Sequence, residues 1–194
     1  MESLQQPIHA APWALIAGGA LLIAGGIVFD LARFGESNAD LALVRVSQTF
    51  FVASVPGLLS GVRALVAALP DRTARTVTIG KALTYAGLAS TAIGSLLSIA
   101  RPSDPPWLNP LGSVLQSAGM LVLGSAVLRS NALSGWQRFV PLLIGGWFFA
   151  HMPFQFAFFA SPSGVPSHTL MMGVWGPLWA LLGGALLERE QTQS

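Results

Sequence analysis

The sequence predicts an all-α membrane protein, a compact bundle of six transmembrane helices with both termini in the cytoplasm. Hydrophobic residues make up 53% of the chain and charged residues only 9%, whereas about a quarter of an ordinary soluble domain is charged. The apolar residues form six stretches, each near the ~20 residues that a helix needs to cross a bilayer. Because the chain has 194 residues, we expect one transmembrane domain, residues 1–194, and no separate soluble domain.

The helices are expected at residues 12–30, 41–68, 79–100, 110–129, 138–160 and 168–187. The first has no Lys or Arg before Trp13, whereas a cleaved signal peptide begins with a positive leader, so we expect a retained helix. The second follows Asp40, a residue type that caps helix N-termini. Prolines interrupt the connectors before the fourth and sixth helices, which predicts tight turns between antiparallel helices.

The basic residues set the orientation, because Lys and Arg concentrate on the cytoplasmic side of membrane proteins. Three lie on one side of the predicted membrane, Arg33, Arg45 and Arg101, and seven lie on the side of the termini, Arg63, Arg72, Arg75, Lys81, Arg129, Arg138 and Arg189. The first helix alone argues the other way, since only its trailing flank is basic. The total places both termini in the cytoplasm, and we expect the cytoplasmic (inner) membrane of a bacterium.

Glycines cluster inside the predicted helices rather than between them. The chain has 21 glycines, and Gly18, Gly19, Gly25 and Gly26 repeat at a spacing of seven on the first helix. Small residues let helix backbones approach closely in a membrane. The four glycines therefore predict helix packing, and in a subunit of a larger assembly they would face lipid and meet a partner. No glycine cluster lies beside a Lys, which argues against a phosphate-binding loop.

Polar residues within the helices gather in the half of the bundle away from the termini, the outer half in this orientation. They are Gln48, Thr49, Ser95, Ser98, Ser113, Gln116, Ser117, His151, Gln155 and His168. Large polar groups in lipid cost several kcal/mol if they are unsatisfied. We therefore expect His151, Gln155, Gln48 and Gln116 to converge on one cavity, with Trp147 as its floor. The alternative is that these residues only form interhelical hydrogen bonds, worth about 0.6 kcal/mol each.

The surroundings of His151 favour a flat or greasy ligand. Pro153 lies between His151 and Gln155 and leaves the carbonyl of Phe149 without its usual donor. Six phenylalanines lie within the same stretch: Phe148, Phe149, Phe154, Phe156, Phe158 and Phe159. A kinked helix with aromatic walls and a polar centre suits binding of a small molecule.

Several chemistries are not favoured by the sequence. There is no cysteine, and the acids near the helices, Asp30, Asp40 and Asp104, lie at the outer rim, so neither a zinc hydrolase nor a proton-coupled pump is indicated. His168 is expected ten residues, or ~15 Å, shallower than His151, too far apart to flank a haem. Serine catalysis with Ser95 or Ser117 lacks an acid to orient His151. We expect no catalytic residue, metal or cofactor.

Three functions remain open. The leading prediction is a non-enzymatic accessory or structural subunit of a membrane assembly, with the lipid bilayer and other membrane subunits or a second copy as partners. The alternative is a small-molecule receptor or carrier that binds an apolar or aromatic ligand around His151. A membrane enzyme acting on lipid or quinone comes third. Nucleic acid is not an expected partner, because the net charge is only +2.

Overall fold

The computed structural model describes residues 10–33, 40–101, 107–158 and 168–193, with the side chains at 33, 154–158 and 193 outside that description. Every element in the described ranges is helical, which confirms the all-α prediction. The elements are α1 (Ala10–Arg33), α2 (Leu41–Ala68), α3 (Arg75–Ala100), α4 (Leu108–Ser130), the 3-10 helix η1 (Gly135–Phe139), α5 (Val140–Phe158) and α6 (His168–Gln193). Five of them, α1, α2, α3, α4 and α6, are long and apolar enough to cross a membrane.

The helix bounds differ from the predicted ones mainly where polar residues extend a helix. α3 begins four residues early, because Asp71 accepts hydrogen bonds from the backbone of Thr73 and Ala74 and orders the turn before it. α6 runs on to Gln193, beyond the predicted end at 187. Hydropathy marks the edge of the membrane, and a helix can continue past that edge into water. The two predicted tight turns fall largely on residues 102–106 and 159–167, which lie outside the described residues.

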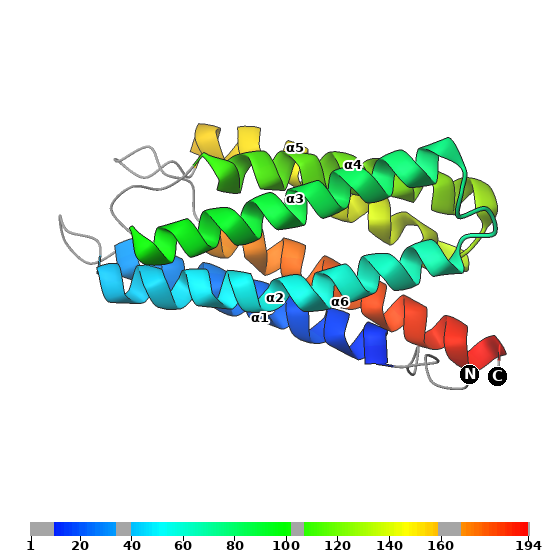
Figure 1. Ribbon diagram of the computed structural model, residues 1–194, viewed down its shortest axis with the longest axis horizontal. Coiled ribbons are helices and arrows are strands. Elements are labelled where there is room, and N and C mark those ends of the chain that lie inside the picture. The colour runs from blue at the N-terminus through cyan, green and yellow to red at the C-terminus, as the bar shows by residue number, and fades with distance from the viewer. Residues whose placement is uncertain (1–9, 34–39, 102–106, 159–167, 194) are drawn as a thin grey trace, which may run out of the picture.

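The helices run along one another in a bundle (Figure 1), and the contacts between neighbours close it into a ring. Each helix packs beside the next in the chain, and α1 also packs along α6, so the first and last helices complete the ring. α1 begins and α6 ends at the same end of the bundle, here called the terminal end. The other end, where α1 ends and α6 begins, is called the opposite end. The contact between α5 and α6 includes two hydrogen bonds, from Trp147 Nε1 to the Met171 carbonyl and from Trp175 Nε1 to the Ile144 carbonyl, each 3.0 Å.

The predicted packing glycines of α1 lie inside the chain. Gly18 and Gly25 pack against α2, and Gly19 and Gly26 pack against α6; all four are buried. Two residues of the repeat thus face one neighbour and two face the other, because adjacent positions differ by about 100° around a helix. The helix-packing role therefore operates within the monomer, and the expectation of a lipid-facing glycine surface for a partner is wrong.

Glycines also bring the backbones of α3 and α4 close together. Gly80 and Gly87 alternate with Gly112 and Gly119, and a Cβ at any of the four would meet backbone of the other helix within 3.1 Å. The spacing of seven on each helix keeps these residues on one side of it. Close backbone contact replaces the hydrophobic driving force that lipid removes.

The outer surface of the bundle suits a bilayer. Trp13 and Trp136 are exposed at the terminal end, and Trp107 is 70% exposed at the opposite end. Tryptophan is the residue type that concentrates at membrane–water interfaces. Between these residues, large apolar side chains such as Leu31, Leu96 and Leu143 are exposed along the helices. Together with the five apolar helices, this surface indicates a membrane location.

Candidate functional site

A cavity of about 250 Å³ lies in the half of the bundle near the opposite end. All six α-helices contribute to its lining: Leu22 of α1, Phe51 and Leu58 of α2, Leu88 of α3, Pro110 of α4, Phe148 of α5, and Trp175 of α6 are among the apolar residues. The cavity reaches the first turn of α4 and the first residue of α6. It therefore lies in the half of the bundle where the sequence concentrates its polar residues.

One wall of the cavity is polar. It is formed by α2, α3 and α4, which contribute Gln48, Thr91, Ser95, Asn109 and Gln116. Each of these has a buried polar atom with no hydrogen-bond partner among the described residues: Gln48 Oε1, Thr91 Oγ1, Ser95 Oγ, Asn109 Oδ1 and Gln116 Nε2. A buried polar group left unsatisfied costs about 1–3 kcal/mol. The wall therefore has unfilled hydrogen-bonding capacity for donors and acceptors from a molecule inside the cavity.

The facing wall comes from α1, α5 and α6 and is apolar except for His168, the first residue of α6. Phe148 and Trp175 lie with ring centroids 6.4 Å apart, and Met152, Met171 and Met172 line the cavity beside them. The indole of Trp175 is fixed by its hydrogen bond to α5. Aromatic rings and thioethers present a polarisable surface that packs well on a flat apolar molecule.

None of the residues that line the cavity is Asp, Glu, Lys or Arg. His168 is the one titratable side chain in the lining, so a charged ligand would have no Asp, Glu, Lys or Arg there to offset the loss of its hydration, which is costly in an apolar environment. The cavity is suited to a neutral molecule. In the described part of the chain, no group of three or more His, Cys, Asp or Glu side chains is placed to hold a metal ion.

Only part of the expected constellation converges on this cavity. Gln48 and Gln116 line it, but His151 and Trp147 are not among its lining residues. The reason is helical geometry: α5 lines the cavity with Phe148 and Met152, which are four apart, and Trp147 and His151 form the adjacent stripe about 100° around the helix. Trp147 is therefore not the floor of the cavity. The side chain of Gln155 lies outside the described residues.

His151 is instead buried beside the cavity-lining stripe of α5. It is 1% exposed, and neither ring nitrogen has a hydrogen-bond partner among the described residues. Its ring lies 5.3 Å from that of Trp147, centroid to centroid. His151 thus packs against an aromatic neighbour, which is the arrangement that argues against its being the polar centre of a binding site.

The expected difference in depth between His151 and His168 is also wrong. The hydrogen bonds from Trp147 to Met171 and from Trp175 to Ile144 set the register of the antiparallel α5 and α6. Trp147 therefore lies level with Met171, and Ile144 lies level with Trp175. Counting along the two antiparallel helices from these pairs places His151 level with residue 167 or 168. The hairpin is offset, and α5 extends about two turns beyond the level at which α6 begins.

Two of the lining residues with an unpartnered polar atom, Thr91 and Asn109, were not expected from the sequence. Thr91 lies four residues before Ser95, and Asn109 lies seven before Gln116, so each pair shares a side of its helix. The spacing was therefore visible in the sequence. Asn109 was overlooked because it precedes the predicted start of its helix at residue 110, whereas α4 begins at Leu108.

Comparison with protein-family models, curated proteins and solved structures finds no match.

Proposed function

We propose that the protein is a membrane receptor or carrier that binds a small, neutral ring compound in the cavity near the opposite end. One observation carries the proposal: five side chains that line a cavity of about 250 Å³ each have a buried polar atom without a partner among the described residues, and no Asp, Glu, Lys or Arg lines that cavity. A planar ring with donors and acceptors along one edge would satisfy the wall of α2, α3 and α4. Its other edge and one of its faces would lie against Phe148, Trp175 and the methionines.

The size of the cavity limits the ligand. A dry engineered cavity of about 150 Å³ accommodates benzene, and this cavity, at about 250 Å³, is larger. One or two fused rings with small substituents fit that volume. The absence of charged lining residues argues for a compound that is neutral at physiological pH.

Binding is favoured over the accessory-subunit function by the position of the glycines. The glycines expected to meet a partner, Gly18, Gly19, Gly25 and Gly26, are buried against α2 and α6. Nothing in the cavity requires a second protein, because all six α-helices of one chain line it. An enzymatic function on lipid or quinone is less favoured, because no Asp or Glu lines the cavity to orient a histidine as a base.

We further propose six membrane spans, with the terminal end in the cytoplasm of a bacterial cell. The sixth span would be α5, whose 19 residues extend about 28 Å at 1.5 Å per residue, close to the ~30 Å hydrocarbon core. The excess of Lys and Arg near the terminal end supports this orientation.

Binding is tested by isothermal titration calorimetry of the purified protein with two matched pairs of compounds. Thymine and 2-naphthol are neutral rings with polar edges, and orotate and 2-naphthoate are anionic counterparts. We expect saturable binding of both neutral compounds. The anions should bind at least about tenfold more weakly, because an uncompensated desolvation of at least about 1.4 kcal/mol raises the dissociation constant tenfold. Gln116→Leu should weaken binding of the neutral pair.

Gln137→Leu provides the matched control, because Gln137 lies on η1, away from this cavity, and bonds Glu188. It should leave binding of thymine and 2-naphthol unchanged. Failure of both neutral compounds to bind, or equal binding in the Gln116→Leu variant, would reject the proposed function in favour of a structural one.

A further inference from the structure

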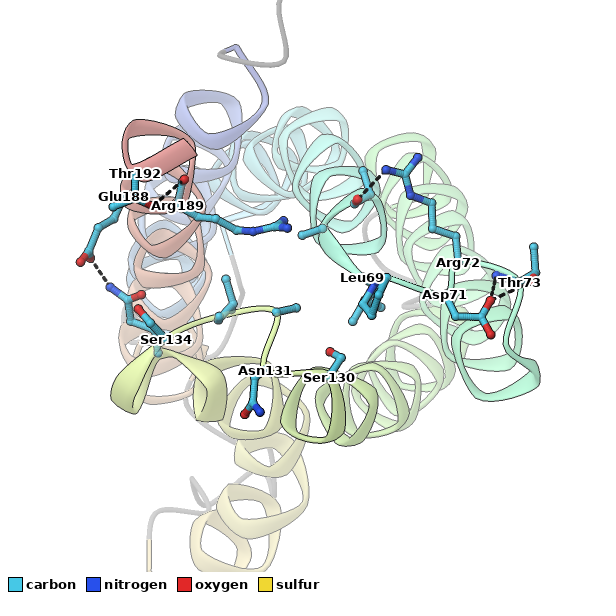
Figure 2. A pocket seen from close by; sticks show the side chains of 16 residues that line it. Leu69, Asp71, Arg72, Thr73, Ser130, Asn131, Ser134, Glu188, Arg189 and Thr192 are labelled. Atoms are coloured by element: carbon cyan, nitrogen blue, oxygen red, sulfur yellow. Dashed lines mark hydrogen bonds between the residues drawn. The ribbon is translucent and has the colours of Figure 1, made fainter. Parts of the chain in front are cut away.

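A second and larger cavity opens at the terminal end of the same bundle (Figure 2). It has a volume of about 840 Å³ and is lined by the end of α2, the turn before α3, the segment from Ser130 to Ser134, and the last turns of α6. We call it the vestibule. Figure 2 shows the helices arranged around it, with the side chain of Arg189 extending from α6 into the opening.

The vestibule is polar where the first cavity is mostly apolar. Asp71, Arg72, Glu188 and Arg189 line it, two of each charge, together with hydroxyl and amide side chains. Arg72 donates to the Ala67 carbonyl at the end of α2, and Glu188 accepts from Gln137. Such a surface holds water, and it would bring water into the bundle from the terminal end.

One apolar layer separates the vestibule from the ligand cavity. On α2 the cavity reaches Leu58 and the vestibule begins at Ala67; on α6 the corresponding residues are Trp175 and Glu188. These separations of nine and thirteen residues correspond to about 14–20 Å along a helix. Fully buried side chains fill the interval, among them Val62, Leu65, Leu123, Ile144, Trp179 and Leu182.

Trp179 is the residue of this layer that we expect to move. Its side chain is completely buried, and its indole N–H has no hydrogen-bond partner among the described residues. Burial of an N–H without a partner is unfavourable. When the ring turns toward either cavity, the indole therefore breaks no hydrogen bond and can form one. Pro177, two residues earlier, removes the backbone donor that the Gly173 carbonyl would otherwise have, which loosens α6 at the level of the layer.

α2 has a proline at the matching level. Pro56 lies inside α2 just before Leu58, the last cavity residue of that helix. It deprives the Val52 carbonyl of its usual donor. α2 and α6 thus both have an interrupted hydrogen-bond ladder where the cavity gives way to the apolar layer, and a bend at these two positions would open the layer without unfolding either helix.

We infer that the protein is a carrier whose ligand passes between the cavity and the vestibule when Trp179 and its layer move aside. This inference rests on the proposed binding function and extends it from holding a neutral ring compound to transporting one. The fully buried side chains of this layer include no Asp, Glu, Lys or Arg, and Arg63, which lies at this level of α2, is exposed, so no buried group there would couple movement to protons. The transport is therefore downhill, driven only by the concentration gradient of the ligand.

The route is tested with single cysteines, which the chain allows because it has none of its own. Ser95→Cys places a thiol in the cavity, and N-ethylmaleimide is a small neutral ring that reports access to it. Adding Trp179→Ala should raise the rate of labelling about tenfold. This is the change expected if the free-energy barrier to entry falls by about 1.4 kcal/mol. Thymine should slow the labelling.

Ser47→Cys is the matched control, because Ser47 is as buried as Ser95 but donates to the Gly25 carbonyl between α1 and α2 and does not line the cavity. Its labelling should not change with Trp179→Ala, which distinguishes an opened layer from a loosened fold. Equal labelling of Ser95→Cys with and without Trp179→Ala, or a parallel rise in Ser47→Cys, would overturn the inferred route.

Transport itself is measured as release of radiolabelled thymine from proteoliposomes. We expect saturable release above that of protein-free vesicles, unchanged by a protonophore. Leu182→Trp should reduce it at least threefold by overfilling the layer, whereas Leu181→Trp, at the neighbouring lipid-exposed position, should not. If thymine binds in calorimetry but is not released, the carrier inference fails and the receptor function stands. If thymine does not bind at all, it is the proposed function that fails.

Discussion

At the scale of single residues, Asp30 shows how one side chain can join distant parts of the chain. It lies near the end of α1, and its two carboxylate oxygens accept hydrogen bonds from the backbone of His168, at 2.9 Å, and of Thr169, at 2.7 Å. A negative charge at a helix N-terminus is favourable, and its oxygens satisfy amides that have no partner within α6. Asp30 therefore caps a helix that begins 138 residues later.

We expect Asp30→Ala to lower the stability of the folded protein by about 1.5–3 kcal/mol, the range for hydrogen bonds to a charged group. Thermal unfolding in detergent measures the change. Asp40→Ala is the comparison, because Asp40 caps α2 with bonds to Ala42 and Leu43 but is exposed. Its loss should be smaller, and an equal or larger shift would contradict a special role for the buried Asp30.

A second prediction concerns Asp71, which lies outside the helices in the turn before α3. Hydrogen bonds from the Thr73 hydroxyl and then the Thr73 backbone hold the pKa of Asp71 below its ordinary value. Because the folded pKa is lowered, its contribution to stability is complete above the unfolded pKa and is lost as the pH falls through the folded one. Thr73→Val removes the largest cause. Carbon-detected NMR titration should then give a higher pKa, and an unchanged titration would disprove the assignment.

At the scale of helices, contacts between backbones make adjacent glycines unequal. A Cβ at Gly183 would lie 2.7 Å from Ile16 Cγ1 and 2.8 Å from the Pro12 carbonyl oxygen, whereas one at Gly184 meets nothing within 4 Å. Gly183→Leu should therefore separate α6 from α1 and cost about 1–3 kcal/mol or more. Gly184→Leu should be neutral or mildly stabilising, since glycine is a poor helix former. Thermal unfolding of the two variants tests this, and similar melting temperatures would contradict the packing.

The helices themselves were predictable because each depends on a local apolar stretch. The bounds of α2 agree at both ends, with Asp40 as its cap. The pairing of helices was not predictable in the same way. Gly19 and Gly26 were assigned to an external partner because the sequence does not say which helix lies beside α1, and only the ring closed by α6 decides this.

At the scale of the whole molecule, the distribution of charge predicts the orientation. A single cysteine at Thr73, near the terminal end, and another placed separately at Ser103, in the connector between α3 and α4, can be treated with a membrane-impermeant thiol reagent. We expect labelling at position 103 in intact cells and labelling at position 73 only after the cells are opened. Preferential labelling at position 73 in intact cells would reverse the orientation and place the vestibule outside.

The candidate site was predictable in its location but not in its members. A band of polar residues in one half of the helices pointed to that half, and Gln48 and Gln116 do line the cavity there. His151 was selected because it is the most costly residue to bury, but its side of α5 is decided by the register with α6. That register depends on two indole hydrogen bonds between the helices, which no local pattern specifies.

The packing of α1 against α6 has a consequence for the order in which the protein is made. During synthesis α1 is made before α6, and its side bearing Gly19 and Gly26 lacks the helix it packs against until α6 has been translated. Asp30 likewise waits for the amides of His168 and Thr169. Until then the ring of helices is incomplete. The side of α1 that bears Gly19 and Gly26, here called the seam, has no helix packed on it. A ribosome-bound chain truncated before residue 168 should therefore present this seam to insertion factors, which site-specific crosslinking from Gly26 would detect.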